Sequence, residues 1–328
     1  MATIGIFGAQ RYSRVMRHVT AEDARRLLDY PGLIEALRTA HKADRMPETY
    51  REIVEDAGNA GNKFVSLLSW ASGDVIAVKL VGVFPGNLSL TPPEPSIQGA
   101  VVLFSAKTGA PLLSVDGAEL TFHKTAADSA LGADYLARKD ARVLLVAGAG
   151  GLAPHVIEAH RAARPGIERV SIWNRTTGRA EELADSLRGR GFEVRAAPSM
   201  AEALPDADIV CCVTMAREPV VQGALLKPGA HVDLIGAYLP DMRESDDETI
   251  RRAGQMFLDT RAFSERSGDV LEPLNRGLIT RAQLVADLFD LCTGRHPGRA
   301  SDDQITVYKN NGGGHLDLFT ARYLLGRV

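Results

Sequence analysis

The amino-acid sequence predicts an α/β protein in which a doubly wound parallel sheet is joined to a second, mixed α+β module. After residue 153, apolar strand-like runs alternate with helical segments, a pattern typical of parallel sheets with helical crossovers. Before residue 116, strand-like runs follow one another directly and are separated by Gly, Pro and Asn. The length of 328 residues suits about two such modules.

The composition is that of an ordinary globular protein, with 45% hydrophobic and 24% charged residues. A net charge of −3 gives no reason to expect nucleic acid or an anionic membrane as a partner. No apolar run reaches the roughly 18 residues of a membrane span, and the first residues lack the apolar core of a secretory signal, so we expect a cytoplasmic protein. The three cysteines show neither metal-ligand spacing nor a disulfide framework, and we expect no metal site.

The first module begins with two predicted helices. Residues 1–20 carry several Arg and little pattern, and we interpret them as a loose arm. Thr20 precedes Ala-Glu-Asp, which is typical of a capped helix start, and a second helix is expected from Leu33 to about Ala43. The strands expected next are 64–68, 75–83, 97–104 and 111–115.

A helix rich in small residues, expected over 121–138, leads into the parallel sheet. The apolar run 143–147 is the first strand of that sheet. The final strand, 304–308, and the helix that follows it to Leu325 are expected to return to the first module. Between them we expect strands at 170–173, 209–213, 232–235 and 256–259, and helices at 156–163, 179–187 and 282–291.

Glycines directly after the run 143–147 predict a dinucleotide site of the Rossmann type. Gly148 permits a tight turn, Gly150 lets the backbone approach a pyrophosphate, and Ala153 lets the next helix pack close to the strand. Pro154 suits the first turn of that helix, whose N-terminal N–H groups would face the phosphates. The residues expected to touch the nucleotide here are Gly148, Gly150, Gly151, Leu152 and Ala153.

The end of the second strand bears on the choice between NADH and NADPH. NAD enzymes usually place Asp or Glu there to accept the ribose 2′-hydroxyl, whereas this chain has Asn174, Arg175 and Thr176, followed by Arg179. An arginine can pair with a 2′-phosphate through two parallel hydrogen bonds, so the sequence favours NADPH. If Arg175 is only a solvated turn residue, NADH would bind through Asn174.

Four cationic residues lie ahead of the glycine-rich strand: Arg51, Lys79, His123 and Lys124. Lys79 interrupts an apolar strand, where a lysine often simply points outward to solvent. Lys124 lies in the first turn of the small-residue helix, where a positive charge opposes the helix dipole. That position indicates an anionic partner, and a plain surface lysine is the alternative.

Several motifs in a fixed order resemble the ornithine cyclodeaminase/mu-crystallin family across nearly the whole chain. They are Lys79 with 85–87, 108–111, 116–117, 121–130, the glycine-rich turn, 173–176, 213–214 with 217–219, 227–231 and 305–309. The resemblance implies a discontinuous substrate-binding domain, residues 1–125 plus 305–328, that forms a homodimer through its sheet. A Rossmann domain, residues 126–304, is inserted in it. The resemblance adds cofactor contacts at Thr125, Thr214, Met215, Gly236 and Lys309.

Two departures from the family pattern direct the assignment within the family. Lys124 stands where most members have arginine, so the charge is kept and the bidentate fork is lost. Tyr238 occupies the position of the aspartate that cyclodeaminases use as a base. The segment resembles instead the ketimine-reducing branch, which includes mu-crystallin and the pyrroline-2-carboxylate reductases.

We therefore expect an oxidoreductase that uses NADPH or NADH to reduce a C=N bond next to a carboxylate, giving an L-amino acid. Such chemistry needs the nicotinamide held against the imine carbon and the substrate carboxylate anchored. By resemblance, the anchors would be Lys79, Lys124 and Arg51. Tyr238 and His123 are candidate proton donors, and Gln98 is expected to face the same cleft.

Two imines are candidate substrates, and the residues favour iminosuccinate ahead of a cyclic ketimine. Asn310, Asn311 and His315 add polar groups, and if they surround the site the set suits a dicarboxylate such as iminosuccinate, with L-aspartate as product. Otherwise a cyclic ketimine such as Δ1-pyrroline-2-carboxylate, reduced to L-proline, fits better. Three further alternatives are an ornithine cyclodeaminase-type lyase, a mu-crystallin-like protein that binds NADPH and a ligand, and an alanine-type amino-acid dehydrogenase.

Overall fold

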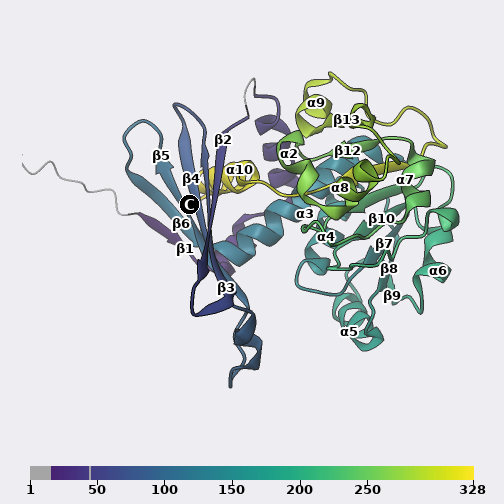
Figure 1. The fold of residues 1–328 in the computed structure, drawn as a ribbon, viewed down its shortest axis with the longest axis horizontal. Helices are drawn as coiled ribbons and strands as arrows, with labels where there is room; N and C mark the ends of the chain where they lie inside the picture. Colours follow the sequence, from purple (N-terminus) through teal and green to yellow (C-terminus); the bar gives the residue numbers. More distant parts are fainter. Residues whose placement is uncertain (1–15, 44–45) are drawn as a thin grey trace, which may run out of the picture.

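The computed structural model describes residues 16–43 and 46–328, and in it two sheets are joined by one long helix (Figure 1). This helix, α3 (Gly117–Leu136), contacts β5 of the smaller sheet and β11 and β14 of the larger one. The side chain of Asp116 accepts a hydrogen bond from Glu119 N and caps the helix, which therefore begins ahead of the expected residue 121. Of the arm expected at 1–20, residues 1–15 lie outside the described part of the chain.

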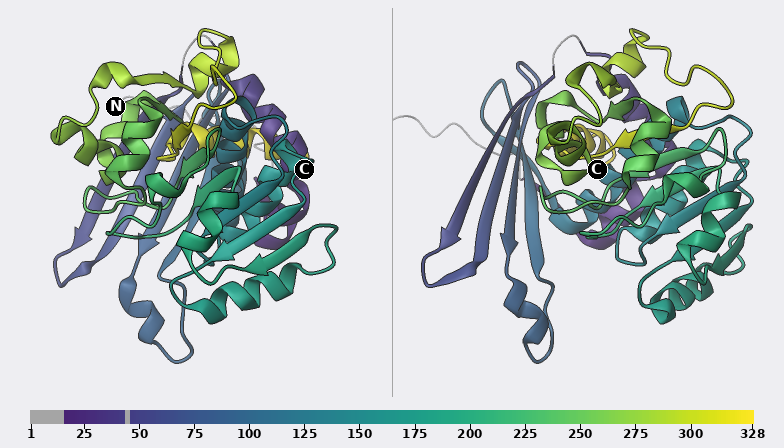
Figure 2. Two further views of the ribbon diagram at one scale, coloured as in Figure 1. Left: turned by 90° about the vertical axis from the view of Figure 1, so that its right-hand side faces the viewer. Right: turned by 45° about the vertical axis from the view of Figure 1, so that its right-hand side comes forward.

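The smaller sheet has six strands in the order β1-β6-β5-β4-β3-β2, antiparallel except for the pair β1 and β6. Helices α3 and α10 (Gly314–Leu325) contact this sheet, and the right-hand view in Figure 2 shows that no other described element covers its opposite face. Strands β1 and β2 were not expected from the sequence. The six strands are β1 Arg17–Val19, β2 Glu48–Asp56, β3 Asn59–Trp70, β4 Val75–Val83, β5 Ile97–Ser105 and β6 Pro111–Asp116.

The larger sheet has eight strands in the order β13-β12-β14-β11-β10-β7-β8-β9, and every pair is parallel. It confirms the predicted doubly wound sheet, and the glycine-rich turn follows strand β7, which lies between β10 and β8. The strands are β7 Val143–Ala147, β8 Arg169–Trp173, β9 Glu193–Ala196, β10 Ile209–Cys212, β11 His231–Leu234, β12 Met256–Leu258, β13 Leu284–Asp287 and β14 Thr306–Lys309.

Two elements near the end of the chain differ from the sequence expectations. Strand β14 does not return to the first module but pairs with β11 and β12 inside the larger sheet, and only α10 goes back to the smaller sheet. The four residues of β14 are all buried, as in a parallel strand covered on both faces. The helix expected at 282–291 is instead β13 followed by the short helix α9 (Leu288–Thr293), because a short apolar run fits a buried strand or a buried helix equally well.

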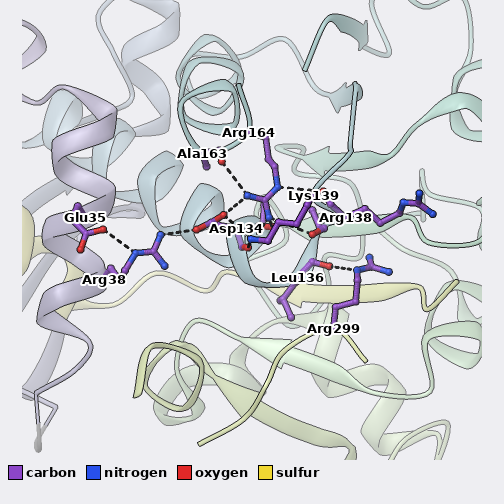
Figure 3. Close-up of polar contacts among 11 residues, drawn as sticks. Glu35, Arg38, Asp134, Leu136, Arg138, Lys139, Ala163, Arg164 and Arg299 are labelled. Atoms are coloured by element: carbon purple, nitrogen blue, oxygen red, sulfur yellow. Dashed lines mark hydrogen bonds and ion pairs between the residues drawn. The ribbon is translucent and has the colours of Figure 1, made fainter. Parts of the chain in front are cut away.

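Ion pairs connect α3 to its neighbouring helices. Asp134, near the end of α3, pairs with Arg38 of α2, with Lys139 and with Arg164 at the end of α4 (Figure 3). No helix in the described ranges is long and apolar enough to cross a lipid bilayer. The remaining helices are α1 Ala21–Leu27, α2 Tyr30–Ala40, α4 Ala153–Ala163, α5 Thr177–Leu187, α6 Met200–Ala203, α7 Asp247–Ala253 and α8 Gly268–Asn275.

Candidate active site

The glycine-rich turn after β7 has the backbone that a pyrophosphate needs. Gly148 has a φ of 113°, and a Cβ there would lie 2.9 Å from the carbonyl oxygen of Val213, so only glycine fits. A Cβ at Gly150 would meet nothing within 4 Å, so the fold itself leaves open space at this residue. Helix α4 begins at the fully buried Ala153, and Leu152 at its N-cap supplies no side-chain hydrogen bond. The open space and the uncapped N-terminus fit a bound anion.

Gly151 has a different neighbour from the other turn residues. A Cβ at Gly151 would lie 2.9 Å from the ring of Phe122 on α3, so glycine is needed here for packing between the turn and that helix. Lys124 follows Phe122 by two residues on α3. The turn that fits the nucleotide is therefore in contact with the helix that carries one of the expected substrate anchors.

The residues after β8 include two arginines with no ion pair among the described residues. Asn174 holds the turn itself, because its Oδ1 accepts a hydrogen bond from Ala149 N at 3.2 Å and its Nδ2 donates to the Thr176 carbonyl at 2.9 Å. Arg175 and Arg179 are exposed and flank the start of α5, whose first turn contains no acidic residue. This concentration of positive charge fits a 2′-phosphate.

The loops after β10 and β11 are joined by a buried carboxylate that the sequence analysis did not single out. Glu244 Oε1 accepts hydrogen bonds from Thr214 N and Oγ1 at 2.7 and 2.8 Å, and Glu244 Oε2 accepts one from Gly236 N at 2.8 Å. Burial raises the pKa of Glu244, and the nearby Asp269 carboxylate raises it further. The side chains of Met215 and Tyr238 are 70% and 52% exposed, so these loops present them at the carboxyl edge of the sheet.

Lys309, expected to touch the cofactor, is completely buried instead. Its Nζ donates to the carbonyl of Ala237 at 2.8 Å and to Asp269 Oδ2 at 3.3 Å. Lys309 therefore supports the loop that carries Tyr238 from beneath. Thr125 lies half-buried on α3, and its carbonyl accepts a hydrogen bond from Asn310 Nδ2 at 3.1 Å.

Lys79 and Lys124 meet at one carboxylate. Lys79 Nζ donates to Thr121 Oγ1 at 2.6 Å and lies 3.3 Å from Asp317 Oδ1, while Lys124 Nζ lies 3.4 Å from the same oxygen and 3.3 Å from the Gly313 carbonyl. Both ammonium groups are buried, so the outward-pointing alternative for Lys79 is wrong. Burial lowers the pKa of Lys79 to about 8, against the attraction of Asp317. Two positive charges against one negative charge leave this site able to bind an anion.

Arg51 projects from the same face of the sheet as Lys79. Arg51 pairs with Leu67, and Leu67 pairs with Lys79, so the three residues form one row and the two cations are about 10 Å apart. Burial and the charge of Arg266 lower the pKa of Arg51. Arg266 ends the 3-10 helix Arg261–Arg266 between β12 and α8, so a cation from the region of the larger sheet approaches Arg51. Arg266 and Asp317 were not among the site residues expected from the sequence.

Two expected site residues point elsewhere. Gln98 pairs with Gly82, three residues from Lys79 on β4, and side chains alternate along a strand, so Gln98 lies on the opposite face of the sheet. It is exposed and donates to the Pro95 carbonyl at 3.3 Å. His123 stacks on Tyr30 of α2, with ring centroids 5.2 Å apart. Adjacent residues of a helix project about 100° apart, so His123 does not point to the side where Lys124 meets Lys79.

Of the three polar residues that suggested a second substrate carboxylate, Asn310 is used by the fold, His315 is enclosed and Asn311 has no side-chain partner among the described residues. Asn310 is buried and donates to Ser129 Oγ at 3.1 Å in addition to the Thr125 carbonyl. His315 is completely buried near His41, and burial lowers its pKa well below the ordinary value, so it carries no positive charge near neutral pH. Neither ring nitrogen of His315 and neither amide atom of Asn311 has a hydrogen-bond partner in the part of the chain that the structure describes.

The family model for the ornithine cyclodeaminase/mu-crystallin family matches residues 14–328. The chain belongs to this family. A Delta(1)-pyrroline-2-carboxylate reductase of Paracoccus denitrificans is 39% identical over 316 residues, which cover 96% of this chain and 98% of that protein. This family membership confirms the resemblance stated from the sequence motifs.

Solved structures of the ornithine cyclodeaminase/mu-crystallin fold match the whole architecture. The Delta(1)-pyrroline-2-carboxylate reductase of Thermococcus litoralis, in complex with NADH and L-proline, has a TM-score of 0.87 at 28% identity and covers 95% of this chain and 97% of its own. The iminosuccinate reductase of Paracoccus denitrificans, in complex with NAD+, has a TM-score of 0.85 at 27% identity and covers 95% and 96%. The reductases among these proteins confirm the ketimine-reducing branch.

Proposed function

We propose that this protein reduces Δ1-pyrroline-2-carboxylate to L-proline, with NADPH as the preferred hydride donor. The coarser assignment is established by its relatives: the protein is an NAD(P)H-dependent oxidoreductase that acts on C=N bonds. The observation that carries the finer proposal is the buried lysine pair on Asp317, which suits one substrate carboxylate. The neutral, enclosed His315 removes one of the groups that favoured a dicarboxylate.

The nucleotide, when bound, supplies the hydride that the imine carbon accepts. Lys79 and Lys124 bind the substrate carboxylate, and Asp317 sets the spacing of their two ammonium groups. The contact between Gly151 and Phe122 joins the nucleotide turn to the helix that carries Lys124, and hydride transfer requires the hydride donor to reach the imine across that helix. The lowered pKa of Lys79, about 8, allows this group to supply the imine nitrogen with a proton near neutral pH. Tyr238 is a second candidate for that proton transfer.

Iminosuccinate is the second candidate substrate, and one observation favours it. Arg51 lies on the same face of the sheet as Lys79, about 10 Å away, and a cation at that distance suits a second carboxylate on the substrate. The structure of the iminosuccinate reductase of Paracoccus denitrificans has the same architecture. Steady-state rates with both imines and both cofactors compare the two proposals directly. Turnover of iminosuccinate without turnover of Δ1-pyrroline-2-carboxylate would reverse the order, and no turnover of either imine would favour the ligand-binding role.

We also propose that two copies associate through the uncovered face of the smaller sheet. Tyr50, Val54, Phe64 and Trp70 alternate along β2 and β3 so that their side chains project from that face. All four are 45% exposed or more, which is unusual for large apolar side chains gathered on one surface. Pairing with a second copy would remove this surface from water.

A further inference from the structure

Three side chains of types that commonly bind metal ions lie close together between α3 and the start of α4. Glu119 and His123 lie one helical turn apart on α3, and His155 lies in the first turn of α4. Oε1 of Glu119 is 3.3 Å from His123 Nδ1 and 3.9 Å from His155 Nε2. One donor atom from each of the three residues lies within 4.8 Å of the other two. Ligand atoms around one tetrahedral zinc ion are about 3.3 Å apart, so the Glu119–His123 separation already fits and the His155 side chain would have to move slightly inward.

One oxygen of the carboxylate in this cluster has no hydrogen-bond partner among the described residues. Glu119 is buried, and its Oε1 accepts no hydrogen bond from any described residue. Leaving such an oxygen buried and unpaired costs about 1–3 kcal/mol or more for a charged group. The two neighbouring groups are imidazoles, and neither donates a hydrogen bond to this oxygen. A cation placed between the three residues would give Oε1 a partner.

The two histidines are neutral at ordinary pH and can act as ligands. Burial lowers the pKa of His155 to about 4, with help from the charges of His123 and Arg25. Burial also lowers the pKa of His123, although the Glu119 and Glu158 carboxylates oppose the effect. His123 Nδ1 lies 3.0 Å from the Glu119 carbonyl, so metal binding at Nδ1 requires the ring to turn away from that carbonyl and its proton to move to Nε2.

Contacts outside the cluster hold the ligands in place. The Tyr30 hydroxyl lies 2.7 Å from His155 Nδ1, which directs the opposite nitrogen, Nε2, toward Glu119. Arg25 pairs with the other oxygen of Glu119 at 2.7 Å and leaves Oε1 facing the histidines. Partners of this kind on the far side of each ligand are typical of protein metal sites.

From this arrangement we propose that Glu119, His123 and His155 form a site for one divalent transition-metal ion, with Zn²⁺ the best match. One carboxylate and two imidazoles are a common zinc ligand set, and a water would complete the tetrahedron. The His155 side chain is 15% exposed, so an ion can reach it. A second cluster, His160 with Cys211 and Asp233, is fully enclosed, and Asp233 already accepts hydrogen bonds from Ser129 and Cys211.

The test is a titration of the untagged, chelator-stripped protein with Zn²⁺ by calorimetry, paired with visible absorption after Co²⁺ is added. We expect one equivalent bound per chain and the absorption of a tetrahedral Co²⁺ site. His155→Gln should weaken binding by about 100-fold or more, and Tyr30→Phe, which removes only an outer contact, by about 10- to 100-fold. His18→Gln, at an exposed histidine on β1, is the matched control and should bind as the unchanged protein does.

The proposal is overturned if the unchanged protein binds no stoichiometric Zn²⁺, or if His155→Gln retains full affinity. An equal loss in His18→Gln would likewise overturn it, since surface histidines would then be the ligands. If His155→Gln does not fold, as judged by circular dichroism, the Co²⁺ spectrum of the unchanged protein decides: a six-coordinate spectrum contradicts the site. Nucleotide turnover of the stripped protein is not part of this decision, so the proposed reductase function stands or falls separately.

Discussion

Lys79 Nζ lies 3.3 Å from Asp317 Oδ1, although the two residues are 238 positions apart in the sequence. Strand β4 carries the lysine and helix α10 carries the aspartate, and both side chains are buried. Lys124 of α3 reaches the same oxygen at 3.4 Å. One strand of the smaller sheet and two helices that contact this sheet thus build one cationic site.

Replacing Lys79 tests the substrate anchor. Lys79→Ala removes one charge-assisted contact to the substrate carboxylate, worth about 1.5–3 kcal/mol, so kcat/KM should fall at least about 10- to 150-fold, and more because the proposed proton donor is lost as well. The dissociation constant for NADPH, measured by fluorescence titration, should stay unchanged because Lys79 lies outside the nucleotide turn. Lys107→Ala, at an exposed loop lysine, is the control. Normal kcat/KM in Lys79→Ala would move the substrate site elsewhere.

The pH dependence of kcat/KM tests the charge on Lys79. Its pKa in the folded protein is about 8, below the ordinary 10.5, so the ammonium group loses its proton as pH rises through about 8 and kcat/KM should fall. Asp317 raises the pKa of Lys79, so Asp317→Asn should move this alkaline limb to lower pH. A structural role for Asp317 alone would change the rate without moving the limb.

The same pKa has a consequence for stability. Between pH 8 and 10.5 the unfolded chain holds a proton on Lys79 that the folded chain has lost, so Lys79 makes the free energy of unfolding rise with pH across this window. Burying the charged lysine therefore costs stability below pH 8. We interpret that cost as the consequence of keeping a cation ready for the substrate.

The sequence was sufficient for the fold class and the nucleotide turn because these depend on local patterns. The strand 143–147 followed by Gly148, Gly150 and Ala153 predicts the turn from neighbouring residues alone. The alternation of helices and strands predicts the parallel sheet. The end of the chain was harder. Residues 306–309 form a strand that pairs with β11 and β12, and no local pattern distinguishes that pairing from a return to the first module.

Side-chain direction explains the errors in the site. Gln98 and His123 were placed by sequence neighbourhood, but strand alternation and the helical rotation turn them away from the lysines. Asp317 and Glu244 were missed because a single acidic residue in a helix or loop has no distinctive spacing. One signal was present: Asp317 follows the Gly-rich run 312–314 near the chain end, where Asn310, Asn311 and His315 were singled out.

Two glycines of the turn should respond differently to substitution. Gly150 faces open space, so Gly150→Val should keep the melting temperature and the circular dichroism spectrum while abolishing measurable NADPH binding. Gly148 has a positive φ and a close carbonyl, so Gly148→Ala should lower the melting temperature itself. Unchanged nucleotide affinity in Gly150→Val would show that the pyrophosphate binds at another place.

The arginines after β8 test the cofactor preference. Arg175→Ala and Arg179→Ala each remove one positive charge from the proposed 2′-phosphate site, so the KM for NADPH should rise about 10-fold or more. NADH lacks that phosphate, and its KM in the same variants is the internal control. Equal effects on both cofactors would mean that these arginines do not distinguish them. A lower KM for NADH than for NADPH in the unchanged protein would contradict the proposed preference.

The uncovered face of the smaller sheet gives the last prediction. Phe64 is 47% exposed there, and Phe64→Lys places a charge among apolar side chains that we propose to be covered by a second copy. Because the side chain is only half-buried in one chain, the monomer should still fold, but the pair of copies should dissociate. Light scattering during gel filtration measures this as a halving of the mass. Glu182→Lys, on the exposed side of α5, is the control and should leave the mass unchanged. A monomeric mass for the unchanged protein would contradict the proposed dimer.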